Sequence, residues 1–131
     1  MRPVMAAPRT LLIVMLDDSW MPGAMAAFTR MGVRVVHEPD PVKAATRIEE
    51  NAPDGVVGHA RARRLALQRL YATLTARDLA NRTVVMAPDS LTGSGLEANP
   101  PEGARKVPSR VEAAEVPAWI MGALGWHVPT A

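Results

Sequence analysis

The segment VRVVHEPDPVKAATRIEENAPDGVVG, residues 33–58, contains two short apolar runs separated by a helical pattern. The runs VRVVH (33–37) and DGVVG (54–58) are rich in valine, which is typical of strands buried in a parallel sheet. Between them, residues 40–51 predict a helix that has Asp40 as its N-cap and a proline at its first position. We expect the inward face of this helix to carry Val42, Ala45 and Ile48. The segment therefore predicts a strand, a helix and a second strand parallel to the first.

The same alternation extends along the rest of the chain. Apolar runs and helical spacings predict strands at 10–16, 82–87 and 104–107 and helices at 19–32, 61–77 and 112–124. Strands that alternate with helices of this length form a parallel sheet with right-handed crossovers. The prediction is an α/β fold, a flavodoxin-like doubly wound sheet of five parallel strands in the order 2-1-3-4-5. Residues 88–103 break the pattern with three Pro and three Gly, so the fourth helix is expected to be shortened or replaced by a loop.

Length and composition indicate one domain without disulfides. A chain of 131 residues has the size of a single domain, expected here over residues 10–125, between a flexible arm at 1–9 and a tail at 126–131. Cysteine is absent, which excludes disulfides, thiolate metal sites and cysteine nucleophiles. The apolar run near the N-terminus is too short for a signal-peptide core or a membrane span, so we expect a cytoplasmic protein with no membrane partner.

Charge is small overall and uneven along the chain. The net charge of +2 gives the protein no global field that would capture nucleic acid. Residues 61–82 carry six Arg and one Asp, whereas residues 38–54 carry five acidic and two basic residues. The sequence therefore predicts a local basic surface on a nearly neutral protein.

The candidate anion or partner patch in the basic segment consists of Arg61, Arg63, Arg64 and Arg69. Guanidinium groups suit carboxylate and phosphate because their planar fork donates paired hydrogen bonds. The alternative is a solvated helix face that balances the acidic helix before it. The aromatic residue of this segment, Tyr71, is expected in the core, so stacking on bases is not available and nucleic-acid binding is not expected.

Three segments together resemble the receiver domain of response regulators. The run LLIV at residues 11–14, followed by acidic residues, is similar to the first strand of a receiver. The segment MGVRVVHEPDPVKAATRIEENAPDGVV (31–57) resembles the second strand, the second helix and the start of the third strand. The segment RLYATLTARDLANRTVVM (69–86) resembles the third helix and the fourth strand. The resemblance covers roughly residues 10–125 and implies a CheY-like fold and a place in two-component signal transduction.

The resemblance also implies a phosphate-accepting pocket, from which this chain departs. A receiver has two acidic residues after its first strand, an aspartate that ends the third, a hydroxyl residue that ends the fourth and a lysine that ends the fifth. Phosphoryl transfer needs this set because a metal ion and a cation must neutralise charge on the phosphoryl oxygens. The candidates at these positions are Asp17, Asp18, His59, Ala87 or Pro88, and Lys106 or Arg110.

The acid pair and the histidine leave alternatives open. Counting back from Gly32 puts Met15 and Leu16 where the acid pair is expected, with Asp17 and Asp18 just beyond. The two acids are candidates for residual Mg²⁺ binding or for helix capping, and His59 is a candidate for accepting phosphate or for simply ending its strand. Because a histidine stands in place of the aspartate, the resemblance implies a degenerate receiver, a pseudo-receiver that uses no metal or other cofactor.

In receivers the fourth helix, fifth strand and fifth helix form the surface that transmits the signal, so the resemblance implies that residues 88–125 form the contact face here. The candidate interface residues are Trp119, which lies off the inward stripe of its helix, and Trp126. The leading hypothesis is a non-catalytic signalling or scaffold protein that binds a protein partner, or itself as a homodimer, through this face. The alternatives are a binder of a small anionic ligand or nucleotide at the arginine patch, and an atypical phosphoacceptor. An enzyme is not expected.

Overall fold

The structure is a computed structural model that describes residues 9–15, 20–59, 64–87, 101–108 and 113–126. Within these ranges the strands are β1 (Thr10–Val14), β2 (Arg34–His37), β3 (Gly55–His59), β4 (Thr83–Ala87) and β5 (Arg105–Pro108). The α-helices are α1 (Met21–Arg30), α2 (Pro41–Glu50), α3 (Arg64–Ala76) and α4 (Val116–Leu124), with 3-10 turns at Ala80–Arg82 and Ala113–Glu115. Each strand and helix coincides with one predicted from the sequence.

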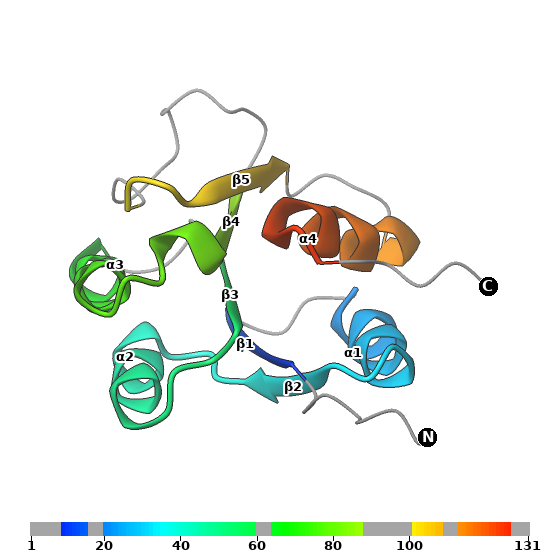
Figure 1. The fold of residues 1–131 in the computed structure, drawn as a ribbon, viewed down its shortest axis with the longest axis horizontal. Coiled ribbons are helices and arrows are strands. Elements are labelled where there is room, and N and C mark those ends of the chain that lie inside the picture. The colour runs from blue at the N-terminus through cyan, green and yellow to red at the C-terminus, as the bar shows by residue number, and fades with distance from the viewer. Residues whose placement is uncertain (1–8, 16–19, 60–63, 88–100, 109–112, 127–131) are drawn as a thin grey trace, which may run out of the picture.

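The five strands form one parallel sheet in the order β2-β1-β3-β4-β5, which confirms the predicted fold. Figure 1 shows α1 and α4 on one face of the sheet and α2 and α3 on the other. Because all strands run in the same direction, their carboxyl ends meet at one edge of the sheet, where ligands bind in open α/β folds. This edge is called the carboxyl edge below.

Each face of the sheet has its own apolar core. The first core cluster lies between the sheet and α1 and α4, and its strand residues are Leu11, Ile13, Val57, Val84, Met86 and Val107. The second core cluster lies between the sheet and α2 and α3, and its strand residues are Leu12, Val14, Val56 and Val85. Successive residues of β1, β3 and β4 thus enter opposite cores, which is why these strands appear in the sequence as continuous apolar runs.

Helix α2 begins as predicted but buries a different set of residues. The Asp40 side chain caps the helix by accepting a hydrogen bond from the backbone N–H of Val42 at 2.9 Å. Val42 itself is 40% exposed, so its predicted place on the inward face is wrong. Ala44 completes the buried face with Ala45 and Ile48, because these three residues group on one side of the helix and leave Val42 on the flank.

The apolar stripe predicted for α3 is confirmed, since Leu67, Leu70, Tyr71 and Leu74 are all buried. The hydroxyl of Tyr71 is also buried, and it has no hydrogen-bond partner among the described residues. Burial raises the pKa of this phenol to about 12, because ionisation would place an unsolvated charge in the core. Tyr71 therefore keeps its proton and acts as a core residue.

Helix α4 packs its predicted stripe against the first core cluster. Val116 and Ile120 are buried, and Ala123 and Leu124 are partly buried against the same cluster. Trp119 lies off this stripe and is 45% exposed, as the sequence predicts. In the part of the chain that the structure describes, no helix is long and apolar enough to cross a membrane.

The segments outside the core ranges are described only in part. The replacement of the fourth helix was predicted in residues 88–103, and 88–100 lie outside the described residues. Residues 101–103 form a turn that ends at Gly103, where a positive φ of 99° favours glycine. Of the predicted arm and tail, Arg9 and Trp126 are described, and the Arg9 guanidinium lies 5.1 Å from the centre of the Trp126 ring. The bounds of the arm and the tail stay a prediction.

Candidate functional site

His59 is the last residue of β3 and lies at the carboxyl edge, the position that the sequence predicts for it. It pairs with Met86 of β4, and Met86 pairs with Val107 of β5. Met86 and Val107 belong to the first core cluster, so the three residues form a row on the α1/α4 side of the sheet. This row contains His59, the residue at which the resemblance to receivers implies a phosphate acceptor.

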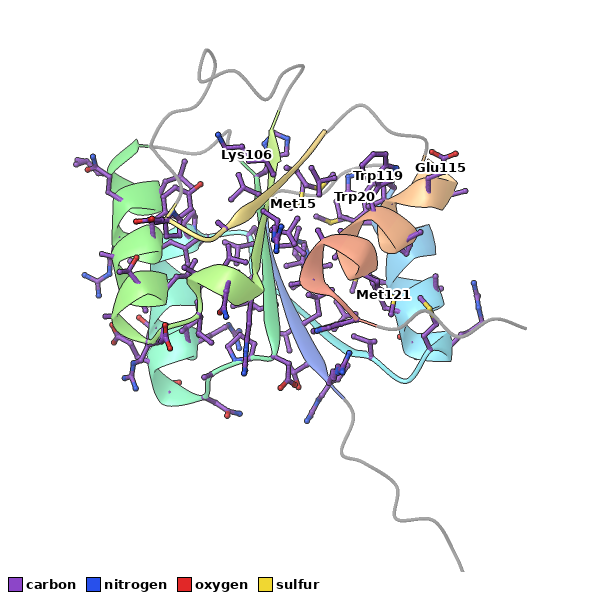
Figure 2. The ribbon with its side chains drawn as sticks, turned by 45° about the horizontal axis from the view of Figure 1, so that its top comes forward. Met15, Trp20, Lys106, Glu115, Trp119 and Met121 are labelled. Atoms are coloured by element: carbon purple, nitrogen blue, oxygen red, sulfur yellow. The ribbon has the colours of Figure 1, made fainter. Side chains whose placement is uncertain are left out.

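The surroundings of this row are apolar. Met86 and Val107 are buried, and so are Met15, which follows β1, and Trp20, which precedes α1. All four belong to the first core cluster, and Figure 2 shows Met15 and Trp20 on the α4 side of the sheet. A phosphoryl group beside them would lose its hydration without gaining a cation from these residues. The described side chains around the row are thus apolar and buried.

His37 is a residue of this edge that the sequence analysis did not single out. It ends β2, and its Nε2 donates a hydrogen bond to the carbonyl oxygen of Met15, 2.8 Å away. Because a carbonyl oxygen can only accept, Nε2 carries the proton in this contact. The signal was present in the sequence, since the strand predicted at 33–37 ends in this histidine and parallel strands end at one edge. His37 holds the backbone that leaves β1.

Glu38 fixes the connection from β2 to α2. Its Oε1 accepts a hydrogen bond from Nε of Arg47 at 3.0 Å, and its Oε2 accepts one from the backbone N–H of Asp40 at 3.2 Å. Burial acts to raise the pKa of Glu38, but the hydrogen bonds from Arg47 and Asp40, with the charges of Arg47 and Lys43, lower it further than burial raises it. The pKa therefore lies below its usual value of 4.5. Glu38 is an ionised structural carboxylate.

None of the other residues predicted for the phosphate pocket is seen beside His59 in the part of the chain that the structure describes. Those outside the described residues are Asp17, Asp18, Pro88 and Arg110. Of Ala87, the structure describes the backbone at the end of β4. Lys106 pairs with Val85 of the second core cluster, so its side chain leaves the sheet on the α2/α3 side, opposite His59. Figure 2 shows Lys106 directed away from α4. The residue of β5 in the row is Val107.

Metal binding finds no support among the described residues. No three His, Asp or Glu side chains in those ranges gather where they could hold a metal ion. Residual Mg²⁺ binding rests on Asp17 and Asp18, so it stays a prediction.

Of the four residues in the arginine patch, the structure describes the side chain of Arg69 only. Arg61 and Arg63 lie outside the described residues, and Arg64 begins α3 with its side chain outside them. Arg69 is exposed on α3 and lines a hollow of about 300 Å³ between α2 and α3, together with Arg77. The Arg77 guanidinium donates a hydrogen bond to the carbonyl oxygen of Glu49 at 3.2 Å. The anion-binding alternative stays a prediction.

A groove of about 780 Å³ runs between β5 and α4. One wall is formed by Ala104–Val107, and the other by Ala118, Trp119, Gly122 and Ala123 of α4. Figure 2 shows Trp119 on α4, in the same half of the molecule as β5. The groove lies within the face that the sequence predicts for partner contact. Trp126 lies elsewhere, partly buried against the first core cluster, and its role in an interface stays a prediction.

No family model matches the sequence. No curated protein matches it either. Solved structures do match, over most of both chains. The response regulator receiver protein from Sinorhizobium medicae superposes with a TM-score of 0.61 at 15% identity, over 90% of this chain and 95% of the other. A transiently phosphorylated "switch" in bacterial signal transduction superposes with a TM-score of 0.66 at 14% identity, over 89% of this chain and 94% of the other.

A third similar structure is the receiver domain of a sensor histidine kinase from Pseudomonas aeruginosa, which has a magnesium ion coordinated in its active-site cleft. Its TM-score is 0.62 at 16% identity, over 91% of this chain and 99% of the other. At these identities the likeness shows the fold, and this chain has the receiver fold.

Proposed function

We propose that this protein is a non-catalytic pseudo-receiver, a cytoplasmic signalling or scaffold protein that acts by binding another protein and does not accept phosphate on an aspartate. The observation that carries the proposal is the row at the carboxyl edge. His59 stands at the end of β3, and the residues beside it, Met86 and Val107, are buried in the first core cluster.

The chemistry of phosphoryl transfer supports the first half of the proposal. An acyl phosphate needs a carboxylate acceptor, a metal ion and a cation near the equatorial oxygens. The residue that β5 contributes to the row is Val107, which is apolar. The Lys106 side chain lies on the opposite side of the sheet. A receiver fold with His59 and Val107 at these positions retains its surfaces, which supports protein binding as its function.

The groove between β5 and α4 supports the second half. Trp119 is a large side chain, 45% exposed at a groove wall. Tryptophan is enriched among the residues that contribute most to protein interfaces, because it buries a large rigid surface at little entropic cost. We therefore assign Trp119 as the anchor of the partner surface.

The first test is an amide NMR titration with Mg²⁺ and then with beryllofluoride, a mimic of the phosphoryl group. We expect no saturable shifts at His59, Met86 or Val107. Saturable shifts that begin at these residues and spread to residues 101–108 would show a working phosphate switch and would overturn the proposal.

The second test addresses the partner surface. A photo-crosslinking amino acid replaces Trp119 in the cell of origin, and a matched one replaces Val42, an apolar residue of α2 that is 40% exposed. We expect a discrete crosslinked protein from position 119 and none from position 42. The captured protein should bind the purified chain, and Trp119→Glu should weaken that binding at least tenfold while Val42→Glu leaves it unchanged. Equal crosslinking from both positions, or loss of binding in both variants, contradicts the proposal.

A further inference from the structure

The groove between β5 and α4 is built along the edge of the sheet. Successive side chains of a strand point to opposite faces, so a groove on one face of β5 would be lined by alternate residues. Here the consecutive residues Ala104, Arg105, Lys106 and Val107 all line it. The backbone edge of the strand is therefore itself part of the groove wall.

Strand β5 lies at one edge of the sheet. Strand β5 is the last in the sheet and pairs with β4, and no strand among the described residues pairs with its other side. Such an edge presents backbone N–H and C=O groups that can bond to another extended chain. Opposite this edge, α4 presents the small residues Ala118, Gly122 and Ala123 beside Trp119, which leaves space for a backbone to approach.

The charges along the groove indicate which kind of extended segment could pair with β5. The charged residues that line it are Arg105 and Lys106, both exposed and both basic. The Arg105 side chain lies on the α4 side of the sheet, and the Lys106 side chain lies on the opposite side of the same edge. Two copies of this protein paired through β5 about a twofold axis would bring these cations against each other, which is destabilising between paired strands. An extended segment with carboxylates would instead meet a cation on each side of the sheet. The charges thus favour an acidic partner over a second copy.

We propose that the groove binds an extended acidic segment of a partner protein, which joins the sheet as a sixth strand beside β5 with an aliphatic side chain beneath Trp119. Backbone hydrogen bonds from β5 hold the segment, and Arg105 and Lys106 select its charge. The inference rests on the proposed function, because it names the kind of segment that the Trp119 surface takes.

The test begins with a library of random seven-residue peptides displayed on phage and selected on the immobilised full-length protein. The enriched peptides should carry at least two acidic residues and one aliphatic residue. Enrichment of basic or uncharged peptides, or no enrichment over an empty surface, overturns the inference.

Two pairs of variants then locate the binding of the best peptide. Gly122→Leu fills the groove, since a Cβ at Gly122 meets no atom within 4 Å, and Gly23→Leu makes the same change at an equally open position of α1. We expect peptide binding to be lost in Gly122→Leu and kept in Gly23→Leu. The double variant Arg105→Glu, Lys106→Glu should weaken binding roughly tenfold or more, as two reversed charge pairs imply. Arg30→Glu with Arg34→Glu, both exposed and outside the groove, changes the net charge equally and should have little effect.

The last test is whether the peptide binds as an extended strand or as a helix. In isotope-labelled complexes, an added strand gives inter-strand contacts from the peptide to residues 104–107 and protects outward amides of β5 from hydrogen exchange. A peptide that binds as a helix overturns the inference. If crosslinking through Trp119 succeeds while no acidic peptide binds, this inference fails and the proposed function stands. If neither crosslinking at position 119 nor binding of an acidic peptide is observed, both the inference and the proposed function are wrong.

Discussion

Gly55, at the start of β3, lies against the indole of Trp126, so closely that a Cβ atom on Gly55 would stand 3.0 Å from Cζ2 of the ring. The same atom would lie 3.1 Å from Cδ1 of Leu124 and 3.2 Å from Cδ1 of Leu11. Trp126, two residues after the end of α4, thus packs onto the central strand of the sheet, and Arg9 lies over its ring. The absence of a side chain at Gly55 is what allows this packing.

Gly55→Ala should therefore destabilise the protein. The added methyl group must displace three side chains, and overpacking of this kind costs about 1–3 kcal/mol in the free energy of unfolding. Gly58→Ala, in the same strand, is the matched control because its Cβ meets no atom within 4 Å. Urea unfolding of both variants measures the difference. Equal stabilities of Gly55→Ala and Gly58→Ala would show that Trp126 does not rest on β3.

Tyr71→Phe should stabilise the protein or leave it unchanged. The change keeps the ring and removes a buried hydroxyl for which the described part of the chain offers no hydrogen-bond partner, so the free energy of unfolding should rise by up to about 1 kcal/mol. Urea unfolding measures this effect. A loss of stability would mean that the hydroxyl makes a hydrogen bond in solution.

Tyr71 also predicts an alkaline limit to stability. It is the single tyrosine of the chain, so ultraviolet absorbance reports its ionisation directly. The folded pKa is raised to about 12 from 10.0, so the unfolded chain ionises first as the pH rises. Stability should fall above about pH 10, and this fall should be smaller in Tyr71→Phe. An absorbance midpoint near 10 in the folded protein would contradict the burial of the hydroxyl.

The strands and helices could be predicted because each is signalled locally. The apolar runs of β1 and β3 and the Asp40 cap of α2 involve neighbouring residues, and the structure has all three. The packing of Trp126 on Gly55 could not be predicted in this way, since the two residues lie far apart in the sequence and only the closed fold brings them together. Val42 was misplaced because helical spacing alone does not say which flank of a stripe meets the sheet.

The candidate site shows the same division. Placing His59 at a strand end needed only the short run before it. The residue of β5 that lies in the same row as His59 could not be chosen without the pairing register of β4 and β5. A shift of one residue in this register turns a side chain to the other face of the sheet. Counting suggested Lys106 or Arg110, whereas the pairing with Met86 puts Val107 in the row.

Glu38→Gln should cost about 1 kcal/mol of stability near neutral pH, because it removes the charge that Arg47 and the N–H of Asp40 stabilise. The pKa of Glu38 is lowered in the folded state, so its contribution is present above the usual value of 4.5 and is lost as the pH falls through the folded pKa. Urea unfolding from about pH 7 to pH 3 should show the wild type and the variant converging in acid. Glu50→Gln, exposed at the end of the same helix, is the control and should change stability little. A gap that stays constant with pH would contradict an ionised Glu38.

His59→Asp should not create a phosphate acceptor. The change supplies a carboxylate, but its neighbours in the row remain Met86 and Val107, neither of which is a cation. Mass spectrometry after incubation with Mg²⁺ and acetyl phosphate should find no phosphate on the variant. Incorporation of one phosphate per chain at residue 59 would show that the apolar row does not prevent the chemistry.

The two cores differ in how early the growing chain can complete them. The buried members of the second core cluster run from Leu12 to Val85, whereas the first needs Val107 and the α4 residues Val116, Ile120 and Met121. While the ribosome adds the last third of the protein, one side of the nascent sheet can already be closed by α2 and α3. The other side is covered by α1 alone, so the part that α4 covers in the finished fold stays apolar and exposed until α4 leaves the exit tunnel. This part is the surface on which a chaperone would hold the chain.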